Sequence, residues 1–182
     1  MQAPGIHEAA GPTRPAALRL RSLRAADADQ LVAGFARLSR EARYLRWFHP
    51  KKQLSAAEVA DLTHPDHCDR EAVAAFSAGG HLLGVARFVR DAGDGSVADV
   101  TVIVGDRYQG HGVGTSLLRE VSDRARHAGV VRLRADILSG NRRMLDLAFR
   151  LWPAHHSVHR GGGVVEVEFD LGPVGTPAPA AA

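Results

Sequence analysis

Residues Val100–Gly114 read VTVIVGDRYQGHGVG, an apolar run typical of a β-strand followed directly by a glycine-rich turn. Apolar residues then recur at helical spacing, namely Val113, Leu117, Leu118, Val121 and Ala125. Glycines let a ligand approach the main chain, and the free N–H groups and positive dipole end of a following helix favour an anion. The stretch therefore predicts a phosphate-binding turn at a strand–helix junction.

The spacing of Gly110, Gly112 and Gly114 excludes two common nucleotide-binding motifs. A dinucleotide fingerprint requires G-x-G-x-x-G, whereas these glycines stand at every second position. A Walker loop requires a lysine after its last glycine, and no lysine follows Lys52. We therefore expect neither a Rossmann dinucleotide site nor nucleotide hydrolysis.

The pattern Gln109-x-x-Gly112-x-Gly114 resembles the acyl-CoA pyrophosphate loop of the GNAT superfamily of N-acetyltransferases. Three further segments are similar to that family's fourth strand, fifth strand and following helix: Asp99–Gln109, Val131–Leu138 and Asn141–Leu147. Three upstream segments resemble bacterial protein lysine acetyltransferases: Ser39–Pro50, Leu54–Thr63 and Asp69–Ala74. The resemblance thus covers both the catalytic half and the half that shapes the acceptor site.

Composition indicates a single domain. The chain has 182 residues, of which 45% are hydrophobic, enough for one substantial core. The single cysteine, Cys68, excludes an internal disulfide framework and fits a reducing compartment. No apolar run approaches the roughly 18 residues of a membrane helix, and the N-terminus lacks a signal-peptide core, so we expect a cytoplasmic protein without membrane contact. A net charge of +3 with scattered arginines does not indicate nucleic-acid binding.

Periodicity divides the chain into tails and one domain. Residues 1–16 and 172–182 are rich in proline, alanine and glycine without periodicity, and we expect disordered tails there. Within the domain, residues 17–171, the patterns predict strands at 18–23, 72–77, 82–90, about 100–104, 131–138, 156–159 and 164–169. They predict helices at 27–38, 40–48, 55–62, after Gly112 and after Asn141. This order indicates an α/β fold with a mixed sheet of the GNAT type.

The resemblance implies how acetyl-CoA, the expected cosubstrate, binds. The fourth and fifth strands of the family splay apart and admit the pantetheine arm, which main-chain groups of Val102, Ile103 and Val104 would bind. The pyrophosphate would be held by N–H groups of Gln109, Gly110, His111, Gly112, Val113, Gly114 and Thr115. Asn141 would contact the cofactor, and its position before a predicted helix equally fits an N-cap. The two roles are compatible.

Acetyl transfer requires a neutral amine to attack the thioester, and a main-chain N–H of the Val100 strand would stabilise the oxyanion. A free lysine with a pKa of about 10.4 is neutral in only about one molecule in 2,500 at pH 7. Asp99 aligns with the glutamate that serves as general base in many relatives, and we expect it to take that role. Because aspartate is one methylene shorter, it would work through an ordered water. The alternative is a solvated acid at a strand end.

No general acid is evident. The position of a tyrosine found in many relatives is Ala148 here, and the only tyrosines are Tyr44 and Tyr108. We expect Tyr108 to pack beside the glycine turn. The CoA thiolate, with a pKa of about 8.5, then leaves unaided or takes a proton from another group.

The remaining candidates have structural interpretations. His64, His67 and Cys68 lie close together but lack a fourth zinc ligand at the usual spacing, so we predict no metal and an acceptor-site loop instead. We expect core or cleft-wall positions for Trp47, Phe48 and Trp152, and a solvated helix face for the arginines of 40–46.

The sequence therefore predicts an N-acetyltransferase that moves an acetyl group from acetyl-CoA to an amine. Because of the upstream resemblance, a lysine of a protein is the leading acceptor. A small-molecule amine is the alternative acceptor, and a non-catalytic acyl-CoA sensor is the alternative class, suggested by Asp99 and Ala148 where relatives have glutamate and tyrosine.

Overall fold

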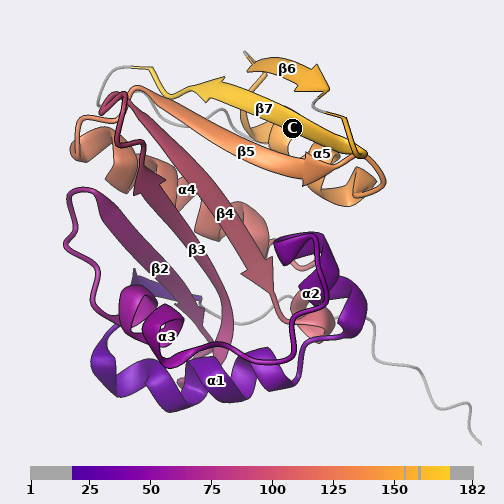
Figure 1. The fold of residues 1–182 in the computed structure, drawn as a ribbon. Helices are drawn as coiled ribbons and strands as arrows, with labels where there is room; N and C mark the ends of the chain where they lie inside the picture. Colours follow the sequence, from indigo (N-terminus) through magenta and orange to yellow (C-terminus); the bar gives the residue numbers. More distant parts are fainter. Residues whose placement is uncertain (1–17, 154, 160, 173–182) are drawn as a thin grey trace, which may run out of the picture.

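The computed structural model describes residues 18–153, 155–159 and 161–172, which form a mixed sheet with helices on both faces (Figure 1). The strands are β1 (Arg19–Ser22), β2 (Arg70–Phe76), β3 (Leu82–Arg90), β4 (Val97–Val104), β5 (Arg132–Leu138), β6 (His155–His159) and β7 (Val164–Asp170). The helices are α1 (Ala28–Ala36), α2 (Arg40–Trp47), α3 (Ala56–Thr63), α4 (Val113–His127) and α5 (Arg142–Leu151). The expected tails lie outside the described residues, apart from Gly172.

The order of elements expected from the sequence is confirmed, with two short 3₁₀ turns added at Ala25–Asp27 and Asp106–Tyr108. Local signals explain the boundaries well. Ser55 caps α3 by accepting a hydrogen bond from the Glu58 N–H, and the Glu58 side chain returns one to the Ser55 N–H. Gly80, with φ of 77°, turns the hairpin between β2 and β3.

Strand pairing divides the sheet into two halves. Its order is β1-β2-β3-β4-β5-β7-β6, and every neighbouring pair is antiparallel except β4 and β5. These two parallel strands pair only at Val97↔Arg132, Ala98↔Leu133 and Asp99↔Arg134. Beyond that point β4 continues along β3 and β5 continues along β7, so the strands diverge (Figure 1). The splay expected from the family resemblance is therefore present.

The two faces of the sheet bury separate cores. Helices α4 and α5 pack on one face over the larger core, whose biggest buried side chains include Phe88, Leu117 and Phe169. On the other face, α1 and α3 cover a smaller core that includes Leu31 and Phe76. Because side chains alternate along a strand, Val100, Val102 and Val104 of β4 face the larger core, whereas Ile103 packs on the α1 side.

The longest helix among the described residues is α4, which has 15 residues and exposes a polar face. Its buried positions recur three or four residues apart, as in a helix that packs one face on a sheet. Across the described ranges, no helix is both long and apolar enough to cross a membrane.

Two glycines should respond in opposite directions to the same substitution. A Cβ at Gly84 would lie 2.7 Å from the Ile103 carbonyl oxygen and 3.1 Å from Leu117 Cδ1, so Gly84→Ala should destabilise the fold by about 1–3 kcal/mol. At Gly34, inside α1, a Cβ would lie 3.7 Å from Leu82, and Gly34→Ala should stabilise by about 0.5–1 kcal/mol. Urea unfolding of both variants measures the difference. Equal effects at the two positions would contradict this packing of β3 against β4.

Candidate active site

A cleft of about 300 Å³ opens where β4 and β5 part. Its walls come from the second half of β4, the glycine turn, β5, α2 and α5. The side chains and glycines predicted to bind acetyl-CoA that line it are Val102, Ile103, Val104, Gln109, Gly110, Gly112, Gly114, Thr115 and Asn141. Residues spread over 40 positions of sequence thus meet in one cavity because β4 and β5 pair only at their starts.

The glycine turn leaves the start of α4 open. Gly110 and Gly112 each have φ of 80°, a left-handed conformation that residues with a Cβ rarely adopt. Gly112 is the N-cap of α4, and no side chain caps the helix there. The first N–H groups of α4 are therefore available to a bound anion beside the cleft. Gly114 has no such backbone requirement: it lies in the first turn of α4, near Leu147.

His111 and Val113 do not line the cleft with their side chains. The Val113 side chain is 1% exposed and belongs to the larger core. Their predicted role used only main-chain N–H groups, so it stays a prediction. The burial of Val113 fixes the first turn of α4 against the sheet and so orients those groups.

Gln109 connects the turn to its neighbours. Its Nε2 donates a hydrogen bond to the Val104 carbonyl at 3.2 Å, and its Oε1 accepts one from Arg143 Nη1 at 3.1 Å. The side chain therefore ties the glycine turn to both β4 and α5. The interaction positions Arg143 at the cleft.

Two basic residues of α5, Arg143 and Arg150, line the cleft and were missed by the sequence analysis. The sequence could have indicated them, because they follow Asn141 by two and nine residues on the helix that was expected to contact the cofactor. Asn141 itself caps α5, because its Oδ1 accepts a hydrogen bond from the Met144 N–H at 3.2 Å. The N-cap role is confirmed, and the cofactor contact stays a prediction.

Asp99 lies at the last paired position before the strands diverge. Its Oδ1 accepts a hydrogen bond from Arg134 Nε at 2.7 Å, while Arg134 Nη2 contacts Asp91 Oδ2 at 3.0 Å. Hydrogen bonds from Asp99 first, and then Asp91, raise the pKa of Arg134 above its usual range. The Asp99 side chain is 54% exposed and does not line the cleft, whose lining on β4 begins at the next residue, Val100. The ion pair with Arg134 could not be seen in the sequence pattern.

We call the point after Asp99 and Arg134 where β4 and β5 diverge the fork. Acidic side chains lie around the fork on one face of the sheet. On β5, Arg134 and Asp136 alternate with Leu133, Ala135 and Ile137, which are buried in the larger core, so they face the opposite side. Asp136 lines the cleft and lies opposite Glu166 of β7, whose Oε2 is 4.0 Å from Arg134 Nε. The carboxylates of Asp99 and Glu166 therefore lie near Arg134, and Asp136 lies on the same face two residues further along β5.

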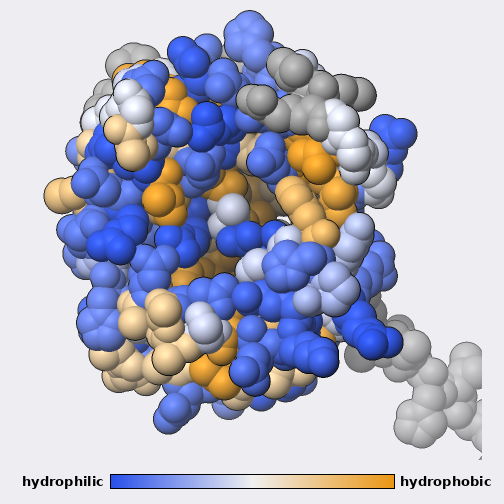
Figure 2. Space-filling view, viewed as in Figure 1, coloured by the Kyte–Doolittle hydropathy of each residue, from blue (hydrophilic) through white to orange (hydrophobic). Residues whose placement is uncertain are grey.

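A second cavity, of about 430 Å³, lies between the sheet and helices α1, α2 and α3, and we call it the apolar chamber. Figure 2 shows a hollow on this face, with apolar side chains inside and polar side chains around its rim. The expectation that all arginines of 40–46 are solvated is wrong for Arg43 and Arg46, which are partly buried. Arg43 donates to the Ala36 carbonyl at 2.9 Å, and Arg46 donates to Thr101 Oγ1 at 3.0 Å. Burial, and then the nearby charge of Arg87, lower the pKa of Arg46 to about 10.

The remaining sequence candidates take structural roles. Ala148 is fully buried, and its methyl side chain supplies no hydroxyl where many relatives have a tyrosine. Tyr108 packs beside the turn against the larger core, as expected. His67 Nδ1 contacts Glu71 Oε2 at 2.8 Å, and Cys68 is exposed. Within the described residues no three potential ligands are grouped to hold a metal, and His64, His67 and Cys68 line neither cavity.

Comparison with known proteins agrees with this geometry. A family model described as the acetyltransferase (GNAT) domain matches residues 17–151. The chain belongs to the GNAT acetyltransferase family. Acetyltransferase Pat from Mycolicibacterium smegmatis is 32% identical over 161 residues, which cover 86% of this chain and 46% of that protein. This chain therefore spans about half the length of that GNAT relative.

Solved GNAT structures show the same architecture. The GNAT domain of S. lividans PAT is 33% identical, with a TM-score of 0.77 over 84% of this chain and 90% of that one. YncA from Salmonella typhimurium, solved with its cofactor acetyl-CoA, has a TM-score of 0.70 over 91% of this chain and 100% of its own. At 18% identity, YncA supports the fold alone.

Arg143 should contribute to binding of the acetyl-CoA phosphates. It is exposed at the cleft, so its loss in Arg143→Gln should raise the acetyl-CoA Kd by about two- to fivefold. Arg142→Gln makes the same change in charge on the same helix, at an exposed residue outside the cleft lining, and should leave the Kd within about 1.5-fold. Calorimetric titration at low salt compares them. An equal rise in both variants would show that only net charge matters.

Proposed function

We propose that this GNAT chain transfers the acetyl group of acetyl-CoA to an amine, and that a lysine side chain of a protein is its principal acceptor. The observation that carries the proposal is the cleft in which a free β4 edge meets an uncapped, glycine-started α4. The similarity to acetyltransferase Pat and to the GNAT domain of S. lividans PAT supports the choice of acceptor.

The cleft suits each part of acetyl-CoA. Beyond Asp99 the β4 main chain has no partner on β5, so the N–H and C=O groups of that edge can bind the amide-containing pantetheine arm as an added strand would. The other edge of β4 stays paired with β3, and the Val104 carbonyl already accepts a hydrogen bond from Gln109. The pyrophosphate would lie at the turn of Gly110 and Gly112, where the dipole and N–H groups of α4 favour an anion. The thioester then lies along β4 near the fork.

The acidic fork suits a cationic acceptor. Asp99, Asp136 and Glu166 lie on one face near the parted strands, and Arg134 contacts Asp99 and Glu166. Their negative potential would attract a lysine ammonium from solvent to the end of the cleft that is nearest the thioester. In the same region the amine must lose a proton before it attacks.

Asp99 would accept that proton through an ordered water. Its side chain is held by Arg134 and does not line the cleft, so a bridging water is the expected path to the amine. The neutral amine attacks the thioester carbonyl, a β4 main-chain N–H stabilises the oxyanion, and the CoA thiolate leaves. Because Ala148 offers no hydroxyl, the thiolate would take its proton from solvent or from the positively charged nitrogen of the tetrahedral intermediate.

Turnover with lysine tests the proposal. A folded protein or peptide that presents lysine should release CoA thiol with kcat/KM at least about tenfold higher than free lysine, because contacts remote from the amine stabilise the transition state. Thiol release and mass spectrometry of the acceptor measure this. Equal values for free lysine would favour a small-amine enzyme. Acetyl-CoA binding without thiol release for any amine would favour a sensor, as the burial of Ala148 in place of a tyrosine suggests.

Removal of the Asp99 charge tests the base. Asp99→Asn keeps the size of the side chain but removes its basicity, so kcat should fall by about 10²–10⁴ while acetyl-CoA affinity holds. The rate of the variant should recover as pH rises, because solvent then supplies neutral amine without enzymatic help. A pH profile of kcat records both effects.

Asp99→Glu is the matched control, since it restores the residue type of the relatives and should remain active. A structural role for Asp99, through its ion pair with Arg134, would give Asp99→Asn a lower Tm and an unshifted pH profile. Near wild-type turnover of Asp99→Asn at neutral pH would exclude Asp99 from proton transfer.

A further inference from the structure

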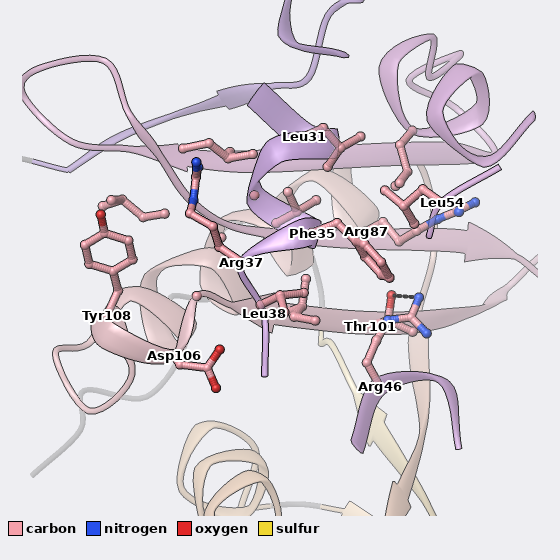
Figure 3. Close-up of a pocket in the computed structure, with 18 of the residues that line it drawn as sticks. Leu31, Phe35, Arg37, Leu38, Arg46, Leu54, Arg87, Thr101, Asp106 and Tyr108 are labelled. Carbon is pink, nitrogen blue, oxygen red and sulfur yellow. Dashed lines mark hydrogen bonds between the residues drawn. The ribbon is translucent and has the colours of Figure 1, made fainter. Parts of the chain in front are cut away.

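The apolar chamber and the acetyl-CoA cleft share one wall. Arg46, Thr101 and Ile103 line both cavities. Figure 3 shows Arg46 reaching from α2 to Thr101, while Arg37, Asp106 and Tyr108 lie at the opposite end of the chamber. A small molecule in the chamber would therefore reach the cleft at Arg46, Thr101 and Ile103, on the side of β4 where the thioester is expected.

The body of the chamber suits a bulky apolar group. Leu31 and Phe35 of α1, Leu54 and Leu62 on the α3 side, and Val85 of β3 contribute apolar side chains. Its volume of about 430 Å³ lies in the range of small-ligand sites. Its charged lining consists of four arginines and Asp106, whose carboxylate already accepts hydrogen bonds from the Ser39 N–H and hydroxyl. A cation, including a lysine ammonium, is therefore a poor occupant.

Arg46 is a partly buried cation that lines both cavities. Among the described residues it makes no ion pair: it donates to the neutral hydroxyl of Thr101, and its guanidinium carbon lies 5.0 Å from the centre of the Trp47 ring. The charge of Glu58 offsets only part of the effect of burial on the pKa of Arg46. The charged groups around it are otherwise engaged, because Glu58 pairs with Lys51 at 2.8 Å and Arg87 with Asp61 at 2.8 Å. A partly buried cation without an anion is unfavourable, and an anionic ligand at this point would relieve it.

These features together specify an acceptor with an anion and an amine at the shared wall and an apolar group in the chamber. We propose a second activity of this site, the N-acetylation of free α-amino acids with bulky apolar side chains, such as leucine or phenylalanine. The α-carboxylate binds Arg46, and the side chain enters the apolar chamber. In an α-amino acid, amine and carboxylate share one carbon, so the amine then lies close to Arg46, at the wall that the chamber shares with the cleft. The inference takes only its acetyl donor from the proposed function.

The transfer balances as an ordinary acyl transfer. The α-ammonium loses one proton to solvent, and the amine nitrogen attacks the thioester carbonyl carbon. The new C–N bond forms as the C–S bond breaks, and the second ammonium proton passes to the CoA thiolate. The products are the N-acetyl amino acid and CoA with a free thiol.

Arg46 variants test the carboxylate contact. With leucine as acceptor, Arg46→Gln should raise KM by about 10- to 100-fold, the usual effect of losing a hydrogen bond between charged groups. With isopentylamine, which is leucine without its carboxylate, the same variant should change KM by less than about threefold. Arg46→Lys keeps the charge and should give an intermediate KM for leucine. Arg40→Gln is the matched control, because Arg40 is an exposed residue of α2 outside both cavities.

Gly34 variants test the chamber. Gly34 lines it from α1, so Gly34→Leu would fill part of the volume and should lower kcat/KM for leucine and phenylalanine at least about tenfold more than for alanine. Gly34→Ala adds only a methyl group and should change this preference by less than about threefold. Thermal unfolding of both variants is measured as well. A cooperative transition at a Tm near that of the wild type would show that the loss of activity comes from a filled chamber and not from a damaged fold.

The outcomes separate this inference from the proposed function. Acetylation of lysine peptides but not of leucine overturns the inference alone. Acetylation of leucine but not of lysine peptides supports the inference and removes the protein acceptor. An equal loss of kcat for leucine and isopentylamine in Arg46→Gln, with KM unchanged, would mean that Arg46 acts on the reacting thioester, which overturns the carboxylate site. No acetylation of any amine overturns both.

Discussion

The parting of β4 from β5 after Asp99↔Arg134 is the constraint on which the rest of the site depends. Each strand keeps a full register with its outer neighbour, β3 or β7, so neither is free to follow the other. Parallel pairing over three residue pairs is enough to fix the fork, and the divergence then exposes one edge of β4. A main chain with unpaired N–H and C=O groups must find partners, and a ligand with amide groups can supply them.

The ion pairs at the fork hold this arrangement in place. Arg134 bridges Asp99 at the end of the paired segment and Asp91 in the turn before β4. The interaction links the two halves of the sheet by side chains where main-chain pairing stops. Removing Asp99 therefore has a structural consequence as well as a chemical one, which is why a pH profile distinguishes its two roles better than a loss of rate.

A contact with the turn after β4 places helix α2, in the N-terminal third of the domain, beside the cleft. Ser39, the N-cap of α2, donates from its N–H and hydroxyl to Asp106, in the turn that follows β4. This contact docks α2 beside the cleft and brings Arg46 to Thr101. The same helix thus lines both the cleft and the apolar chamber, although the glycine turn and the parted strands lie much later in the chain.

The sequence alone determined the features that depend on local geometry. Gly112 with a left-handed φ, Ser55 and Asn141 as helix caps, and the order of strands and helices all follow from interactions within a few residues. Family resemblance extended this to the splay of β4 and β5. Only the tertiary structure decided the partners separated by long stretches of chain: Asp99 with Arg134, Gln109 with Arg143, and Arg46 with Thr101. Arg46 shows the reason most clearly. A charged residue on a polar helix face has the same local sequence pattern whether its side chain faces water or a cavity. Only the packing of α2 against β4 determines which of the two it faces.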